Sequence, residues 1–256
     1  MTLARVLNAE LLKMKRTIAL KMVVLAPAVV VLPILFVGSQ APFSTFNYNG
    51  IANKWRVLAI LTLRVWAILM MPLYVTLETA LIAGLDHSEN QWKSLVARPF
   101  PRWTLYLAKL VVVVGMTALS TTVLLCGILI DGAVLARVQS EVVFGSPVPW
   151  AAILRDGAQV MGLGFLALTI QHWVSLRWRS FSVGIGVGIV AIVVGVFAAA
   201  AQQQGGSWFE YFPWALPMLV LARQPHNLQA ALLISSVIGL LVAAAGALDF
   251  CRREIK

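Results

Sequence analysis

Three residue types that form catalytic triads in hydrolases, Asp86, His87 and Ser88, stand next to one another in this chain. Adjacent residues point in different directions on a helix, so these side chains cannot form the hydrogen-bonded relay that activates a serine. The histidines at His87, His172 and His226 are dispersed, and none belongs to an i,i+4 pair or a carboxylate cluster that would bind a metal. We therefore predict neither catalytic residues nor a metal site.

The glycine pattern does not indicate a nucleotide site. The chain has no G-x-x-x-x-G-K-[ST] loop, the sequence that cradles ATP phosphates in P-loop proteins. Gly184, Gly186 and Gly188 lie inside an apolar stretch, without the βαβ setting that a dinucleotide loop requires. The spacing of Gly184 and Gly188 favours close packing against another helix instead. We expect this chain to bind no cofactor.

Two charged residues, Arg64 and Glu78, fall inside one apolar stretch. On an ideal α-helix their spacing returns them to nearly the same face. Charged side chains inside membrane spans usually line a bundle interior or a wet cavity, whereas those near the ends of a span can also snorkel to the interface. Both interpretations stay open here. If the first holds, Arg64 and Glu78 line a translocation path.

These residues belong to a chain that is 60% hydrophobic and only 12% charged, against about 25% charged in soluble domains. Six apolar stretches are long enough to cross a ~30 Å hydrocarbon core, where the backbone must satisfy its own polar groups as helix. They cover approximately residues 18–37, 57–85, 105–130, 158–176, 182–201 and 228–248. The sequence therefore predicts an all-α polytopic membrane protein with six transmembrane helices in a single domain, residues 1–256.

The distribution of basic residues predicts the orientation of these spans. With the N-terminus in the cytoplasm, the cytoplasmic segments hold Arg5, Lys13, Lys15, Arg16, Lys93, Arg98, Arg102, Arg177, Arg179, Arg252, Arg253 and Lys256, and the outer segments hold only Lys54, Arg56, Arg137, Arg155 and Arg223. By the positive-inside rule, both termini are cytoplasmic. The net charge of +10 is thus explained by membrane topology, and we expect no nucleic-acid partner.

Residues 1–16 predict an amphipathic helix that lies in the plane of the membrane. Its apolar face holds Leu3, Val6, Leu7, Leu11 and Met14. Glu10 interrupts this face, where an unpaired carboxylate would be costly. Its side chain is therefore expected to reach the headgroup layer or a nearby lysine.

Two further segments outside the spans have patterns of their own. Residues 86–98 predict a short amphipathic helix on the cytoplasmic side, either docked in a groove of a soluble partner or lying on the inner leaflet. Residues 208–217 are aromatic and apolar but are interrupted by Pro213 and Pro217. Because this segment is too short and too broken for a seventh span, it predicts an outer re-entrant hairpin before the last span.

In this order, the parts resemble the type-2 ABC exporter permeases, in particular the six-span immunity permeases that protect bacteria from lantibiotic and bacitracin-like peptides. Ala9-Glu-Leu-Leu-Lys-Met-Lys-Arg16 is similar to the opening in-plane helix of that family. His87-Ser-Glu-Asn-Gln-Trp-Lys-Ser-Leu, with Pro99-Phe-Pro-Arg and Leu105-Tyr-Leu-Ala-Lys109 after it, resembles the cytoplasmic coupling region and the start of the third span. Tyr211-Phe-Pro-Trp-Ala-Leu-Pro217 resembles the Pro-Trp-x-x-Pro element before the last span.

The resemblance implies a transport subunit, not an enzyme. Two permease subunits, identical or different, would pair in the bacterial cytoplasmic (inner) membrane among its lipids. Two copies of an ATP-binding-cassette ATPase, which hold ATP and Mg, would dock on their cytoplasmic helices. The complex would export an amphipathic substrate, namely a peptide antibiotic, a lipid or a drug, by alternating access. Antibiotic resistance or immunity would be the outcome for the cell.

Two sets of residues outside the spans are expected to have roles in this transport. Those expected to dock the ATPase are Asp86, Glu89, Trp92, Lys93, Leu95 and Val96. Those expected to form an outer gate are Glu210, Tyr211, Pro213, Trp214 and Pro217. Two other classes of protein stay open, a structural or assembly subunit of another membrane complex and a membrane-embedded lipid-modifying enzyme.

Overall fold

The structure is a computed structural model of the whole chain. It describes residues 3–15, 17–40, 51–88, 101–138, 144–178, 180–202, 212–221 and 228–252. These residues form helices and connecting segments, and no strand occurs among them. The predicted all-α fold is therefore confirmed.

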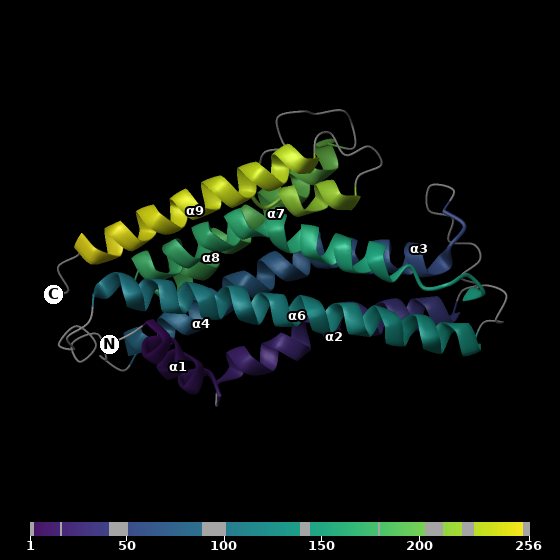
Figure 1. Cartoon of the computed structure of the whole chain (residues 1–256), viewed down its shortest axis with the longest axis horizontal. Coiled ribbons are helices and arrows are strands. Elements are labelled where there is room, and N and C mark those ends of the chain that lie inside the picture. Colours follow the sequence, from purple (N-terminus) through teal and green to yellow (C-terminus); the bar gives the residue numbers. More distant parts are fainter. Residues whose placement is uncertain are drawn as a thin grey trace.

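The helices follow one another along the chain and are named as in Figure 1. They are α1 (Leu3–Met14), α2 (Ile18–Gln40), α3 (Lys54–Val65), the π-helix η2 (Trp66–Met70), α4 (Met71–Ser88), α6 (Arg102–Val138), α7 (Trp150–Arg177), α8 (Phe181–Gln202), the 3-10 helix η5 (Leu216–Leu221) and α9 (Leu228–Arg252).

Six helical segments in the described part of the chain are long and apolar enough to cross a membrane, as predicted. They are Ile18–Gln40, Lys54–Leu85, Arg102–Val138, Trp150–Arg177, Phe181–Ala201 and Leu228–Arg252. Several extend beyond the apolar stretches seen in the sequence. The 37 residues of α6 reach about 55 Å at 1.5 Å per residue, so this helix continues past a ~30 Å hydrocarbon core.

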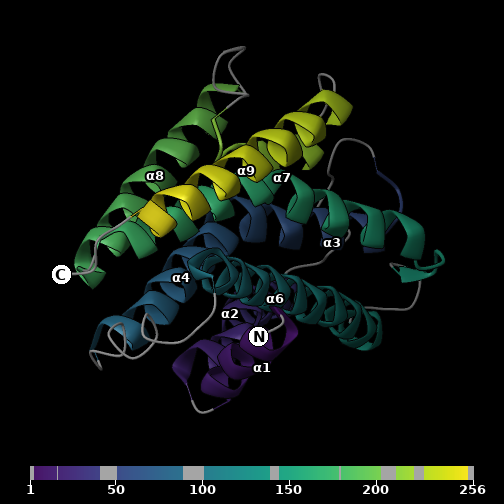
Figure 2. The ribbon, with the colours of Figure 1, turned by 60° about the vertical axis from the view of Figure 1, so that its left-hand side comes forward.

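The second span, formed by α3, η2 and α4, is the central element of the bundle. In its most apolar window 61% of residues are buried, against 28% in α2 and 33% in α8 and α9. Figures 1 and 2 show α1 and α2 on one side of this span and α7, α8 and α9 on the other. The peripheral helices expose large apolar side chains such as Leu32, Phe36 and Phe197, as lipid-facing helices do.

Helix α2 contains two prolines, Pro27 and Pro33, yet stays α-helical. Pro27 has no N–H with which to bond the carbonyl of Val23, one turn earlier. The hydroxyl of Ser120 on α6 donates to that carbonyl at 2.9 Å and is fully buried. A polar side chain of the neighbouring span therefore completes the hydrogen bonding of α2.

Helix α1 confirms the predicted N-terminal helix, and one of its sides is buried by the protein. Val6, Glu10 and Met14 are buried against the protein, and α1 packs chiefly on α6. Leu11 is 44% and Leu12 61% exposed. The side of α1 that carries Glu10 is therefore packed onto α6, and the position of this helix in the plane of the membrane stays a prediction.

The segment 212–221 precedes α9 and ends in the short helix η5. Among its residues, Trp214 through Leu219 are buried. The segment packs mainly on α7 through η5. Its ten described residues are too few to span a membrane, and the predicted re-entrant hairpin on the outer side stays a prediction.

We expect the Ser120→Ala substitution to destabilise the protein by about 1–3 kcal/mol, because it leaves the buried Val23 carbonyl without a partner. Thermal unfolding of the purified protein in one detergent would measure the change. Thr122→Ala is the matched control, since its exposed hydroxyl bonds Ala118 of its own helix. Equal losses for the two variants would contradict a stabilising role for the Ser120 bond.

Candidate functional site

Glu78 lies at the centre of the bundle, on α4 where it faces α6. It is 1% exposed. The hydroxyl of Thr117 lies 3.3 Å from Glu78 Oε2 and 2.8 Å from the carbonyl of Val113. Since a hydroxyl has one proton to donate, it cannot serve both acceptors at once. Glu78 Oε1 has no hydrogen-bond partner among the described residues, so the carboxyl is enclosed but incompletely satisfied.

The surroundings of Glu78 are polar but carry no charge in the described part of the chain. Tyr74, one turn earlier on α4, places its hydroxyl next to the carboxyl. No lysine or arginine pairs with Glu78 among the described residues. A buried carboxyl without a cationic partner is costly, and such groups inside membrane proteins usually serve a function. Glu78 is therefore the strongest functional candidate among the predicted residues.

Arg64 lies on the same span but on the other side of η2. The π-helix holds about one residue more than the α-helical turn it replaces, which rotates the following face by roughly 100°. The expectation from an ideal α-helix, that Arg64 and Glu78 share one face, therefore does not hold. Arg64 is half-buried whereas Glu78 is enclosed, and the structure does not bring the two together.

A buried ion pair that was not predicted from the sequence holds α1 on α6. Lys109 Nζ donates to Glu10 Oε2 at 2.6 Å, and Lys13 Nζ donates to Glu10 Oε1 at 2.8 Å. Glu10 is 2% and Lys109 1% exposed. Lys13 is thus the nearby lysine that was expected for Glu10. Lys109 lies inside an apolar stretch, and this position was the sequence signal that it needs an acidic partner.

A second ion pair lies at the opposite end of the bundle. Arg56 Nη1, on the first turn of α3, is 2.5 Å from Asp156 Oδ2 on α7. Asn53 caps α3 by accepting from the backbone N–H of Arg56, and its side-chain amide donates to the carbonyl of Pro147 at 3.0 Å. These contacts join the start of the second span to the start of α7. Asp156 was not among the residues predicted to be functional.

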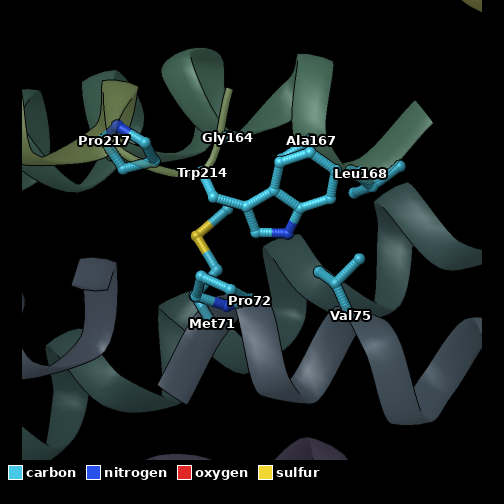
Figure 3. Close-up of a pocket in the computed structure, with 8 residues that line it drawn as sticks. All are labelled: Met71, Pro72, Val75, Gly164, Ala167, Leu168, Trp214 and Pro217. Carbon is cyan, nitrogen blue, oxygen red and sulfur yellow. The ribbon is translucent and has the colours of Figure 1, made fainter. Parts of the chain in front are cut away.

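The 212–221 segment covers the middle of the central span, as Figure 3 shows. Trp214 lies above Met71, Pro72 and Val75 of α4, and α7 supplies the opposite wall. The full lining of this pocket is Met71, Pro72, Val75, Gly164, Ala167, Leu168, Trp214 and Pro217. Every one of these side chains is apolar.

Two glycines allow this close fit. A side chain at Gly164 would overlap the Met71 Cε atom, and a Cβ at Gly195 on α8 would lie 3.0 Å from the Cβ of Trp214. Larger residues at either position would displace Met71 or Trp214. Of the predicted outer-gate residues, Trp214 and Pro217 are therefore buried against the central span, and Pro213 is half-buried. Glu210 and Tyr211 lie outside the described residues.

Most of the predicted docking residues also lie outside the described part of the chain, namely Glu89, Trp92, Lys93, Leu95 and Val96. The backbone of Asp86 belongs to the last turn of α4, which ends at Ser88. The docking helix at 86–98 therefore stays a prediction. No group of three or more His, Cys, Asp or Glu side chains that could hold a metal occurs among the described residues.

Comparison with known proteins gives one match. Residues 6–195, about three quarters of the chain, match the family described as ABC-2 family transporter protein. The match includes most of α1, the central span with Glu78 and most of α8, and it stops before the 212–221 segment. No curated protein matches the chain, and no solved structure does.

We expect Lys109→Met to detach α1 from α6. Removing one partner of a buried ion pair typically costs about 3–5 kcal/mol, because the other charge is left buried. A cysteine at Val6, which is 6% exposed, should then react with an aqueous thiol reagent in a chain lacking Cys126 and Cys251.

Two variants control this measurement. Lys15→Met removes an exposed lysine and should leave the cysteine at position 6 protected. The double variant Glu10→Leu, Lys109→Leu should also leave it protected, because it removes both charges together. Full protection in Lys109→Met would show that the ion pair does not hold α1.

Proposed function

The chain belongs to the ABC-2 family of transporter proteins, and from this we propose that it is the membrane-spanning permease subunit of an ATP-driven exporter. The family match over residues 6–195 is the observation that carries the proposal. The six helices long enough to cross a membrane agree with it. This chain would supply the walls of the path, and a separate ATP-binding-cassette ATPase would hydrolyse ATP with Mg.

In this proposal the substrate is an amphipathic molecule, namely a peptide antibiotic, a lipid or a drug, and export contributes to antibiotic resistance or immunity. Two permease subunits, identical or different, pair in the bacterial inner membrane with both termini in the cytoplasm. Two ATPase copies bind them from that side. The basic residues at the ends of α7 and α9, Arg177 and Arg252, support this orientation by the positive-inside rule.

The ATPase is proposed to dock on residues 86–98, with Trp92 as the anchor and Asp86, Glu89, Lys93, Leu95 and Val96 around it. This segment continues from α4, which contains Glu78 and reaches Ser88. Movement of the docked segment would therefore pull on the same helix that carries the buried carboxyl. A direct mechanical connection between the ATPase and the bundle interior follows from this continuity.

The translocation path is proposed to open next to Glu78. Glu78, on α4, is buried against α6, so these two helices must separate during transport. The 3.3 Å contact of Glu78 with the Thr117 hydroxyl is a weak restraint. The contact between α4 and α6 at Glu78, called the seam below, is therefore suited to opening. Once exposed, the carboxylate would attract a cationic group of the substrate. Arg64 is proposed to line the same path at a different angle.

The exit of the path is proposed to be gated by the 212–221 segment together with Glu210 and Tyr211. Trp214 and Pro217 already cover the central span from one side. Removing Trp214 from its pocket would uncover Met71 and Pro72. The segment would then act as an outer gate that closes when Trp214 occupies this pocket.

We expect Trp92→Ala to weaken the binding of the ATPase by about 30-fold or more, since losing an aromatic anchor costs ~2 kcal/mol or more. Copurification from native membranes and vanadate-sensitive ATP hydrolysis would measure the effect. Trp150→Ala is the control, because Trp150 is 55% exposed at the far end of α7. If no ATPase copurifies even with the unaltered chain, a structural or assembly subunit becomes the better interpretation.

We expect Glu78→Gln to reduce substrate transport in proteoliposomes by roughly ten- to hundredfold. This corresponds to the loss of one charge-assisted contact, roughly 1.5–3 kcal/mol. The substitution preserves size, so the amount of protein in the membrane and the binding of the ATPase should be unchanged. Full activity of Glu78→Leu would remove Glu78 from the proposed path.

A further inference from the structure

The central span changes its hydrogen bonding at residues 66–70. Here the π-helix η2 interrupts the α-helix, and the backbone N–H of Met71 donates to the carbonyl of Trp66, five residues back. Single π-turns inside α-helices are rare overall, and those that occur are often found at functional sites. This one lies in the most buried of the six candidate spans.

Pro72 gives this π-turn a local cause. Its ring has no N–H for the carbonyl of Ile68, and in an α-helix it would clash with that carbonyl. A wider turn moves the carbonyl aside. The prolines of α2 are accommodated differently, since that helix stays α-helical while Ser120 of α6 donates to the carbonyl freed by Pro27. The second span instead accommodates Pro72 by a change in its own backbone hydrogen bonding.

Two other elements contact the π-turn and the residues directly after it. Trp66 is fully buried, and its indole N–H donates to Thr121 Oγ1 of α6 at 3.3 Å. Immediately after the turn, Met71 and Pro72 lie under Trp214 of the 212–221 segment (Figure 3). The turn is therefore contacted through a hydrogen bond to the neighbouring span α6 and by the apolar cover of the short 212–221 segment.

We propose that residues 66–70 and Pro72 form a hinge in the central span, and that Trp214 holds this hinge in its present conformation. Sharp bends in helices occur at prolines and at π-turns, where the regular ladder of hydrogen bonds is interrupted. Both causes coincide here. When Trp214 leaves its pocket, α4 swings relative to α3 about this turn.

The hinge deepens the proposed function, on which its role in transport rests. Glu78 lies about two turns beyond the π-turn, so a swing of α4 carries the carboxyl away from Thr117 on α6. The far end of α4 reaches Ser88, next to the proposed docking segment. Bending at 66–70 therefore couples three events, namely movement of the docked segment, opening of the seam at Glu78 and release of the 212–221 segment.

Movement at the hinge is measurable in the chain alone, without an ATPase. Spin labels on Leu61→Cys and Leu77→Cys, which are half-buried residues on either side of the turn, would be about 24 Å apart in a continuous helix. The chain would lack Cys126 and Cys251 and would be placed in lipid nanodiscs. We expect one dominant distance in the otherwise unaltered chain and a second, separate distance when Trp214→Ala is added.

The decisive variant deletes Ile68 and also carries Pro72→Ala, and it is called the Ile68 deletion below. Removal of one residue from the π-turn, together with the proline that would clash in an α-helix, gives a continuous α-helix and keeps the angular register of α3 and α4. In the deletion variant we expect a single narrow distance that Trp214→Ala does not change. If the deletion variant fails to fold, Pro72→Ala takes its place with the same expected result, because it restores the missing N–H and removes the clash.

A matched control uses α6, which has no π-turn. Labels on Val111→Cys and the native Cys126, both exposed, should give the same distance with and without Trp214→Ala. An unchanged Leu61–Leu77 distance in Trp214→Ala would overturn the hinge. So would a second distance that persists when the Ile68 deletion and Trp214→Ala are combined.

The role of the hinge in transport has its own readout. In the reconstituted complex, the Ile68 deletion should keep ATPase binding and lose substrate transport, and full transport in this variant would overturn that role. If no ATPase binds any variant, the proposed function fails, while the distances in nanodiscs still decide whether the hinge exists.

Discussion

A polar group that enters the hydrocarbon has no water to bond and must find its partner inside the protein. The observed packing follows from this constraint. Pro27 frees a carbonyl in α2, and Ser120 of α6 meets it. Glu10 enters the apolar face of α1, and Lys109 meets it. In each case one unsatisfied group determines which helix must be the neighbour and at what height it must lie.

The central span is where this constraint is met least completely. Glu78 keeps one carboxyl oxygen without a hydrogen-bond partner among the described residues, and a π-turn replaces the regular ladder at residues 66–70. The unsatisfied carboxyl and the π-turn both lie on the central span, which the other helices surround. Peripheral spans that face lipid have no such tolerance, since protein does not enclose them. A transporter gains from placing its adjustable parts where neighbouring helices can stabilise more than one arrangement.

The sequence predicted the spans because hydrophobic length and charge are properties of single segments. It also identified Glu78, since a carboxylate in an apolar stretch is visible without a structure. The π-turn was not predicted, although Pro72 was present, because prolines inside spans have several solutions and α2 shows another. The partner of Asp156 was missed for a related reason, since the ion pair with Arg56 joins residues whose proximity depends on the packing of α3 against α7.

The ion pair between α1 and α6 joins residues that are 99 positions apart. The ribosome therefore delivers Glu10 long before Lys109 exists. During synthesis Glu10 has only Lys13, three residues away, and α1 cannot take its final place until the third span has been inserted. The first helix to be made is thus among the last to be secured. Folding of this chain is consequently not a simple sequence from the first residue to the last, and its N-terminal segment waits for a span made much later.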